Sequence, residues 1–181
     1  MYFQKKIITF LIFLFFFLTK ADDMNKFNLI SPEKEWQFIS DQVMGGVSFG
    51  KKELLFEDKK QYLRMTGFVS LDNNGGFIQV RHKLIDKVRS ANGIKINARG
   101  NNKKYRIHIR TKFTLLPWQY YSATFNVNKN WEIIKIDFNE FIRSGTLLPK
   151  TFNVGHINSL AVVAYGEEYK VRIDLSELNF Y

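Results

Sequence analysis

YRIHIRT, residues 105–111, alternates apolar and polar side chains without interruption. Tyr or Ile occupies its odd positions up to 109, and its even positions carry Arg106, His108 and Arg110. Alternation with a period of two is typical of an antiparallel strand that buries one face and solvates the other. This stretch therefore predicts a sheet with a cationic outer face.

The same kind of pattern recurs along the chain. GIKINARG (93–100) and YKVRIDL (169–175) also alternate, and Asn- and Gly-rich turn signals separate the segments. Only 83–91 and 139–145 could hold a turn or two of helix. Many short strands without helices between them predict an all-β fold, a β-sandwich of jelly-roll type. The further strand-like segments are YLRMTGFVSL (62–71), GGFIQVRHKL (75–84), YYSATFNV (120–127), WEIIKIDF (131–138) and NSLAVVAYG (158–166).

The N-terminus has the order of a secretory signal. Lys5 and Lys6 precede an apolar run from Ile7 to Leu18, and small residues up to Ala21 follow. The run is shorter than the roughly 20 residues that span a bilayer, so we expect cleavage, with an uncleaved membrane-anchored form as the alternative. The sequence thus predicts an exported (periplasmic or extracellular) protein. It consists of a signal peptide over 1–21, a lead-in over 22–31 and one domain over 32–181.

Composition and motifs argue against several functions. The chain has no cysteine, so disulfides and thiolate metal sites are excluded. His82, His108 and His156 lie far apart, and no metalloprotease, nucleophile-elbow, phosphate-loop or dinucleotide motif is present. We therefore expect no enzyme, no cofactor and no metal site. The net charge of +10 suits anionic lipid or acidic glycan, whereas export disfavours nucleic acid.

Two sets of residues are candidates for binding a partner. Arginine suits bidentate recognition of carboxylate or phosphate, so outward-facing cations on neighbouring strands predict an anion or partner face. Ion pairs within the protein, or a face that only meets water, are the alternatives. The set comprises Arg81, Lys95, Arg99, Arg106, His108, Arg110 and Arg172.

The second set lies in the loop LLPWQYY, residues 115–121. Trp118, Tyr120 and Tyr121 concentrate ring surface between two strands. Exposed Trp and Tyr anchor protein partners, and their rings also stack on sugars. The alternative is that Trp118 caps the end of the core.

Two glycine pairs stand beside strand-like sequence, in DQVMGGVS (41–48) and NNGGF (73–77). Glycine there marks a tight turn or a close approach. We expect Gly45-Gly46 and Gly75-Gly76 to turn with positive φ or to let two segments pass closely, with buried anchors at Met44 and Phe77. The functional alternative is a partner-binding rim made by Asp41, Gln42, Ser48, Asn73 and Asn74.

These two motifs carry a resemblance. Together with the later strands, they make the chain from about Trp36 to Tyr181 resemble the complex I intermediate-associated protein 30 family. The resemblance implies a galactose-binding-like jelly roll without known catalysis. Mitochondrial members act as chaperone-like factors in building respiratory complex I, which implies protein partners, possible respiratory-complex subunits among them. A secretory signal departs from that pattern, because the assembly role is exerted on the matrix side.

Two functions follow as hypotheses. The first is a non-enzymatic protein-binding or assembly-factor module, exported or membrane-associated. The alternative is an extracytoplasmic carbohydrate-binding module, suggested by the export signal, the jelly roll and the aromatic loop. A sugar site needs an aromatic ring beside hydrogen-bonding groups, whereas a protein site needs a larger apolar patch with a polar rim.

Overall fold

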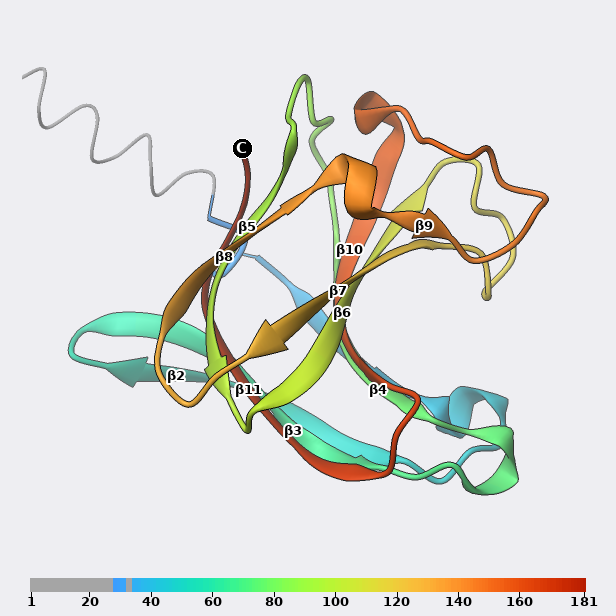
Figure 1. The fold of residues 1–181 in the computed structure, drawn as a ribbon. Helices are drawn as coiled ribbons and strands as arrows, with labels where there is room; N and C mark the ends of the chain where they lie inside the picture. Colours follow the sequence, from blue (N-terminus) through green and yellow to red (C-terminus); the bar gives the residue numbers. More distant parts are fainter. Residues whose placement is uncertain (1–27, 32–33) are drawn as a thin grey trace, which may run out of the picture.

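A computed structural model describes residues 28–31 and 34–181 of the chain. The expected signal peptide and most of the lead-in lie outside the described residues. Two antiparallel sheets pack face to face as a sandwich, as predicted (Figure 1). No helix in the described part is long and apolar enough to cross a membrane.

Each sheet joins strands that are distant in the sequence. The order is β1-β4-β10-β6-β7-β9 in the six-stranded sheet and β2-β3-β11-β5-β8 in the five-stranded sheet. The first contains β1 (Trp36–Ser40), β4 (Phe77–Lys83), β10 (Ile157–Tyr165), β6 (Lys103–Thr111), β7 (Tyr121–Val127) and β9 (Ile142–Arg143). The second contains β2 (Phe49–Glu57), β3 (Lys60–Val69), β11 (Tyr169–Phe180), β5 (Gly93–Gly100) and β8 (Glu132–Asp137). Single 3-10 turns are η1 (Asp41–Met44), η2 (Asp72–Asn74), η3 (Phe138–Glu140) and η4 (Val154–His156).

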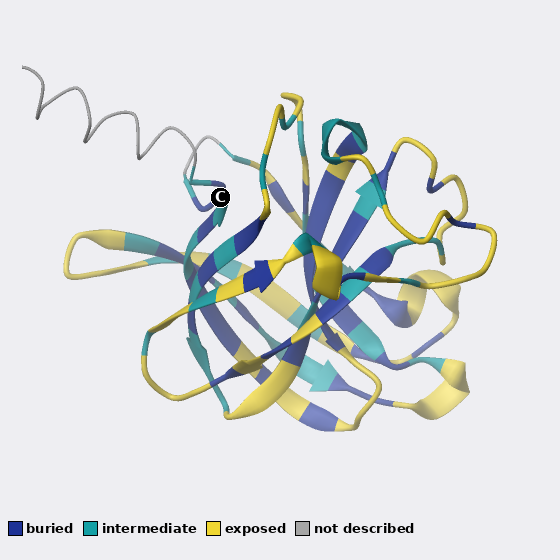
Figure 2. Cartoon of the chain, turned by 45° about the horizontal axis from the view of Figure 1, so that its top comes forward, coloured by how far each residue is buried: buried dark blue, intermediate teal, exposed yellow. Residues whose placement is uncertain are grey.

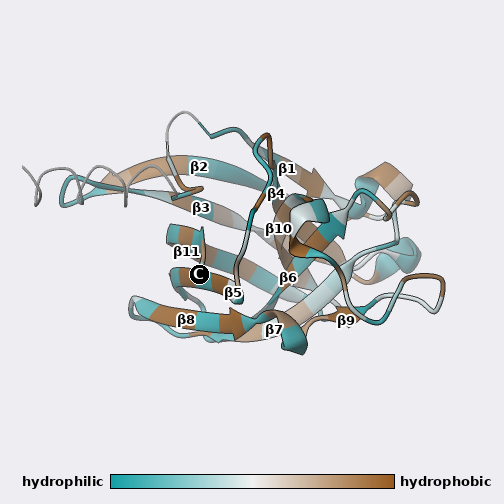
Figure 3. Ribbon diagram, turned by 90° about the horizontal axis from the view of Figure 1, so that it is seen from above, coloured by the Kyte–Doolittle hydropathy of each residue, from teal (hydrophilic) through white to brown (hydrophobic). Residues whose placement is uncertain are grey.

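The core lies between the sheets and follows the period-two pattern. On β6, Tyr105, Ile107 and Ile109 are buried, and burial alternates along most strands (Figure 2). Hydropathy alternates in the same way, most plainly on β5, β8 and β11 (Figure 3). Because only one face of each sheet meets the core, the other faces are left for polar and charged side chains.

The last residues of the expected lead-in take part in this core. Leu29 and Ile30 are buried. The Leu29 amide donates to the carbonyl of Leu178 at 3.0 Å, and the Trp36 indole donates to the carbonyl of Leu29 at 2.9 Å. The segment before β1 is thereby tied to β11. Of the two weak helix signals, 83–91 forms no helix and 139–145 contributes only to η3.

The glycine pairs surround one buried carboxylate. Asp41 is fully buried and accepts hydrogen bonds from the amides of Ser48 at 2.9 Å, Gly76 at 2.6 Å and Phe77 at 3.2 Å, and from the Ser48 hydroxyl. Burial by itself raises the pKa of Asp41, and these hydrogen bonds outweigh burial, so the pKa lies below its ordinary value. This carboxylate joins η1 to the start of β4.

The glycines give the carboxylate its space. A Cβ on Gly46 would lie 2.4 Å from the Asp41 Cγ, and one on Gly75 would lie 2.5 Å from its Oδ2. Gly45 and Gly76 have φ of +89° and +136°, a region that side chains rarely adopt. The expected close approach and positive φ are both confirmed, but the approached group is a side chain and not a second backbone.

Three expectations for these motifs are wrong. Asp41 and Ser48 are fully buried, so neither can belong to a partner-binding rim. Met44 is 63% exposed and anchors nothing, because η1 turns it outward. Phe77 is half-buried. Gln42, Asn73 and Asn74 are exposed on η1 and η2.

Replacing Gly46 by alanine tests this arrangement. The new methyl group would collide with the Asp41 carboxylate, so we expect Gly46→Ala to lower the free energy of unfolding by about 1–3 kcal/mol. Gly145→Ala is the matched control, because nothing lies within 4 Å of a Cβ there. Thermal and urea unfolding measure both. Equal stability of the two variants would contradict the close approach.

Candidate binding surfaces

The structure divides the predicted cationic set between two faces. Arg81, Arg106, His108 and Arg110 belong to β4 and β6 of the six-stranded sheet, whereas Lys95, Arg99 and Arg172 belong to β5 and β11 of the other sheet. The expectation of one shared sheet is therefore wrong. The chain changes sheets between β5 and β6, so segments that are adjacent in sequence expose their cations on opposite sides of the sandwich.

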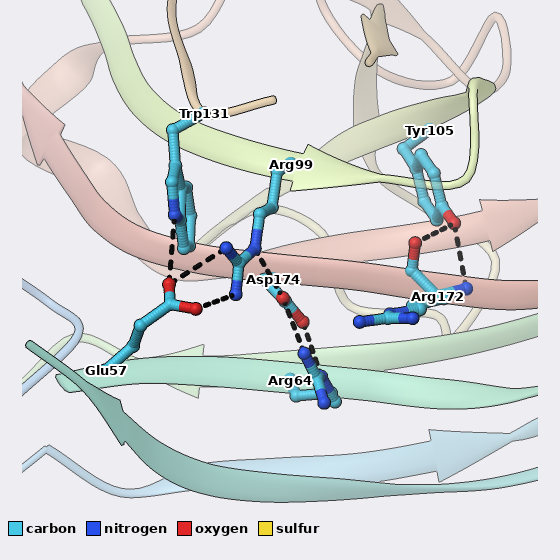
Figure 4. Close-up of polar contacts among 7 residues, drawn as sticks. All are labelled: Glu57, Arg64, Arg99, Tyr105, Trp131, Arg172 and Asp174. Atoms are coloured by element: carbon cyan, nitrogen blue, oxygen red, sulfur yellow. Dashed lines mark hydrogen bonds and ion pairs between the residues drawn. The ribbon is translucent and has the colours of Figure 1, made fainter. Parts of the chain in front are cut away.

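On the five-stranded sheet the arginines are paired within the protein. Asp174, which is 1% exposed, accepts from Arg64 Nε at 2.6 Å and Arg64 Nη2 at 2.8 Å, and from Arg99 Nε at 2.9 Å (Figure 4). Arg99 Nη1 also lies 2.8 Å from Glu57, and Lys95 pairs with a glutamate on β11 at 2.6 Å. The alternative of internal ion pairs holds for this sheet.

Aromatic rings hold this network in place. The Arg99 guanidinium lies 4.5 Å from the Trp131 ring centroid, and the Trp131 indole donates to Glu57 at 3.4 Å (Figure 4). The exposed Arg172 is held only through its backbone, whose amide lies 3.3 Å from the Tyr105 hydroxyl. Its guanidinium makes no ion pair with any described residue.

The pair of arginines controls the ionisation of Asp174. Burial raises the pKa of Asp174, but hydrogen bonds from Arg64 and Arg99, together with their charges, outweigh burial and place the pKa below its ordinary value. Because the folded-state pKa lies below the unfolded value of about 3.9, the ionised carboxylate stabilises the fold at neutral pH. This stabilisation is lost as the pH falls through the folded-state pKa.

Asp174→Asn tests the network. Removing the carboxylate leaves two arginines without their partner, so we expect a loss of about 3 kcal/mol in the free energy of unfolding at pH 7. The gap from wild type should narrow as the pH falls below about 4. Glu167→Gln is the control, since its pair with Lys103 is exposed and is worth at most about 1 kcal/mol. A pH-independent gap would contradict the assignment.

On the six-stranded sheet the arginines have no such partners. Within the described residues, no carboxylate pairs with Arg81, Arg106 or Arg110. The central strand β10 carries only short outward residues between them: Ser159, Ala161 and Val163. The pairing register is Arg81–Ala161–His108 in one row and Gln79–Val163–Arg106 in the next.

The arginines of this face are held near one another. Arg110 Nη2 donates to the carbonyls of Thr114 at 2.8 Å and Leu116 at 3.0 Å. Burial lowers the pKa of Arg110, and the charge of Arg81 lowers it further. The Arg81 Nε is buried and has no hydrogen-bond partner in the described part of the chain. Arg106 lies over the Tyr165 ring, 4.5 Å from its centroid.

His108 stands in the middle of this face. Its ring stacks on Tyr120 with centroids 3.9 Å apart and planes 9° from parallel. Burial, and then the charge of Arg106, lowers the pKa of His108 to about 3, so the imidazole is neutral at physiological pH. Its Nε2 is buried without a hydrogen-bond partner among the described residues. We call Arg81, Arg106, His108, Arg110, Tyr120 and Tyr165 the arginine face.

The three candidate rings of the aromatic loop also lie in different environments. Trp118 is 64% exposed, so it does not cap the core. Tyr120 joins the arginine face. Tyr121 is buried, and its hydroxyl donates to the carbonyl of Pro149 at 3.1 Å, so the expectation that it contacts a partner is wrong.

Trp118 lies on one of two neighbouring segments that carry exposed apolar side chains. Ser144 joins them: its hydroxyl donates to the carbonyl of Trp118 at 2.8 Å and accepts from the Tyr120 amide at 3.1 Å. Beside them, Phe113, Phe152 and His156 help to line a cavity of about 480 Å³. The exposed side chains, here called the apolar loop patch, are Phe113, Leu115, Leu116, Trp118, Ile142 and Leu147. Sequence reasoning missed Phe113, which lies outside the predicted loop 115–121, and also Ile142 and Leu147, whose only signal is apolar residues in a turn-rich segment.

Comparison with known proteins places the fold. The family model described as complex I intermediate-associated protein 30 matches residues 25–175. The family 11 carbohydrate-binding module of a Clostridium thermocellum cellulase superposes with a TM-score of 0.68 at 15% identity, covering 84% of this chain and 92% of that one. The same module in complex with a β-1,3-1,4-mixed-linked tetrasaccharide gives 0.68 at 14%, covering 85% and 94%. At such identities the likeness shows the fold alone. No curated protein matches the sequence.

Proposed function

Because the chain belongs to the complex I intermediate-associated protein 30 family, we propose that it is a non-catalytic module that binds a protein partner. The partners we propose are respiratory-complex subunits or other membrane proteins. The location we propose is outside the cytoplasm, after export by residues 1–21 or while still anchored by them. The resemblance in sequence and the apolar loop patch support this proposal.

The apolar loop patch is the observation that carries it. Leu115 is 82% exposed and Leu147 84% exposed, beside Trp118 at 64%. Exposed apolar side chains gathered on neighbouring segments mark interaction sites, and tryptophan is enriched among the residues that dominate binding energy. Lys112, Arg143 and Lys150 lie in the same two segments, and neither 112–120 nor 141–153 contains an acidic residue.

The buried acids support a role without catalysis. Asp41 is saturated by amide and hydroxyl donors, and Asp174 by two arginines. Both carboxylates are thereby committed to holding the fold. No group of three His, Asp or Glu side chains gathers as metal ligands within the residues that the structure describes.

Carbohydrate binding is the second candidate function. The arginine face favours it, because the aromatic rings Tyr120 and Tyr165 lie there beside unpaired hydrogen-bond donors. Rings beside convergent polar groups on a rigid sheet suit a sugar better than a large apolar partner. The two candidate functions use different surfaces and can be tested separately.

Replacing Trp118 and Leu147 by serine tests the first candidate. Both side chains are exposed, so we expect an unchanged melting temperature and about tenfold less partner recovered. The measurement is a crosslinked pull-down of the tagged full-length protein from its own cells, quantified by mass spectrometry. Phe56→Ser is the control, because Phe56 is 71% exposed on a different part of the molecule, in β2.

The outcome separates the patch from its alternatives. Loss of the same partners from the double variant, but not from Phe56→Ser, supports the patch as the docking surface. Undiminished recovery with the double variant contradicts it. The N-terminus of the recovered bait reports signal cleavage, since Asp22 is expected after removal of residues 1–21.

A further inference from the structure

The two outer faces of the sandwich differ in whether their arginines are paired with carboxylates. On the five-stranded sheet, Arg64 and Arg99 share the carboxylate of Asp174. On the six-stranded sheet, no described carboxylate lies within ion-pair distance of Arg81, Arg106 or Arg110. Partly buried cations that repel one another cost free energy unless a negative charge compensates them. The arginine face is therefore incomplete without an anion.

Three successive rows across the face each carry one arginine. Arg110 lies opposite Ser159 towards one end of β10, and Arg106 lies opposite Val163 towards the other end, over Tyr165. Arg81 lies between them, opposite Ala161 and in the row of His108. Along β6, three residues lie between Arg106 and Arg110, whose backbone positions are therefore about 13 Å apart. The Arg110 guanidinium is held by the carbonyls of Thr114 and Leu116, and the Arg106 guanidinium by the Tyr165 ring. This separation suits a ligand that carries more than one negative group.

Neutral groups occupy the space between the two ends. The exposed fraction of His108 is 8%, and its buried Nε2 has no hydrogen-bond partner among the described residues. Tyr120 stacks over it. The short outward residues Ala161 and Val163 are 3% and 1% exposed, so the flanking side chains cover the centre of β10. On the protein, a tyrosine ring lies beside a histidine, with a cation towards each end of the face. This arrangement is complementary to a ligand in which an uncharged ring lies between two acidic substituents.

We infer that the arginine face binds an acidic saccharide chain, whose carboxylate or sulfate groups pair with Arg81, Arg106 and Arg110. The inference rests on the second candidate function and names its ligand class. An acidic protein segment fits less well, because the neighbouring outward residues Gln79, Ser122 and Thr124 are polar, and protein interfaces centre on apolar anchors. The apolar loop patch supplies such anchors elsewhere, on the two loops.

Binding of defined oligosaccharides to the full-length protein tests the inference. The probes are an oligogalacturonate, a heparin oligosaccharide, a neutral mixed-linkage glucan and poly-L-glutamate, each followed by isothermal titration calorimetry. Arg106→Gln removes the cation at one end of the face, and Arg81→Gln removes the cation in the row of His108. Arg172→Gln is the matched control, because it removes the same charge from an exposed, unpaired arginine on the opposite sheet.

We expect the oligogalacturonate or the heparin oligosaccharide to bind, and the two probes distinguish carboxylate from sulfate. Each face variant should weaken that binding at least about tenfold, with no change for Arg172→Gln. The melting temperature of the face variants should be no lower than that of wild type, because each removes an uncompensated cation. Raising the salt concentration from about 50 to about 500 mM should weaken it steeply.

Three outcomes would overturn the inference. Neutral glucan binding as tightly as the acidic probes would leave carbohydrate binding standing and remove the anion site. Preference for poly-L-glutamate would assign the face to an acidic protein. Absence of binding to every saccharide would remove the second candidate function together with the inference. None of these results bears on the pull-down through the apolar loop patch.

Discussion

The buried carboxylate of Asp41 must be compensated by hydrogen-bond donors, and the end of the fold where η1 meets β4 depends on this. Water does not reach the group, so protein donors must replace its hydration. Three amides and a hydroxyl do so. They come from Ser48 and from Gly76 and Phe77, and Gly76 is 35 residues after Asp41 in the chain. The glycines on both sides leave room for the carboxylate. The glycine pairs in DQVMGGVS (41–48) and NNGGF (73–77) thus serve to hold this buried carboxylate in the fold.

The need to compensate buried charge also separates structural charges from functional ones. Asp174 is compensated within the sheet by Arg64 and Arg99. The arginine face lacks such compensation, because its cations contact no described carboxylate. Two of its polar atoms, Arg81 Nε and His108 Nε2, are buried without partners among the described residues. A protein that compensates one face and not the other has a place for an external anion. The likeness in fold to sugar-binding modules fits this interpretation but does not carry it.

Much of the fold could be predicted from the sequence, since alternation reports directly which side chains face the core. The strands around 93–111 and 169–175 are confirmed in this way. β2 was not predicted, because FGKKELLFE does not alternate and its hairpin with β3 leaves Phe56 exposed. Alternation also could not assign a strand to a sheet, and so the cations on β5 and β6 were wrongly placed together.

The candidate sites were predicted less well than the fold, for a related reason. Residue type shows that Asp41 can bind a partner or hold a turn, and only the burial of its surroundings decides between these roles. Trp118 was a correct choice for an exposed ring, whereas Ile142 and Leu147 join it only because Ser144 brings their loop alongside. Contacts between segments distant in sequence are what one sequence cannot supply.

The most direct test of the account follows the arginine side chains themselves. Nitrogen-15 spectra of the Arg Nε–H groups, recorded while an acidic oligosaccharide is added, report each guanidinium separately. The account predicts that Arg81, Arg106 and Arg110 shift on titration, while Arg64 and Arg99, held by Asp174, do not. Shifts confined to Arg64 and Arg99, or equal shifts on both sheets, would contradict the division into a structural face and a binding face.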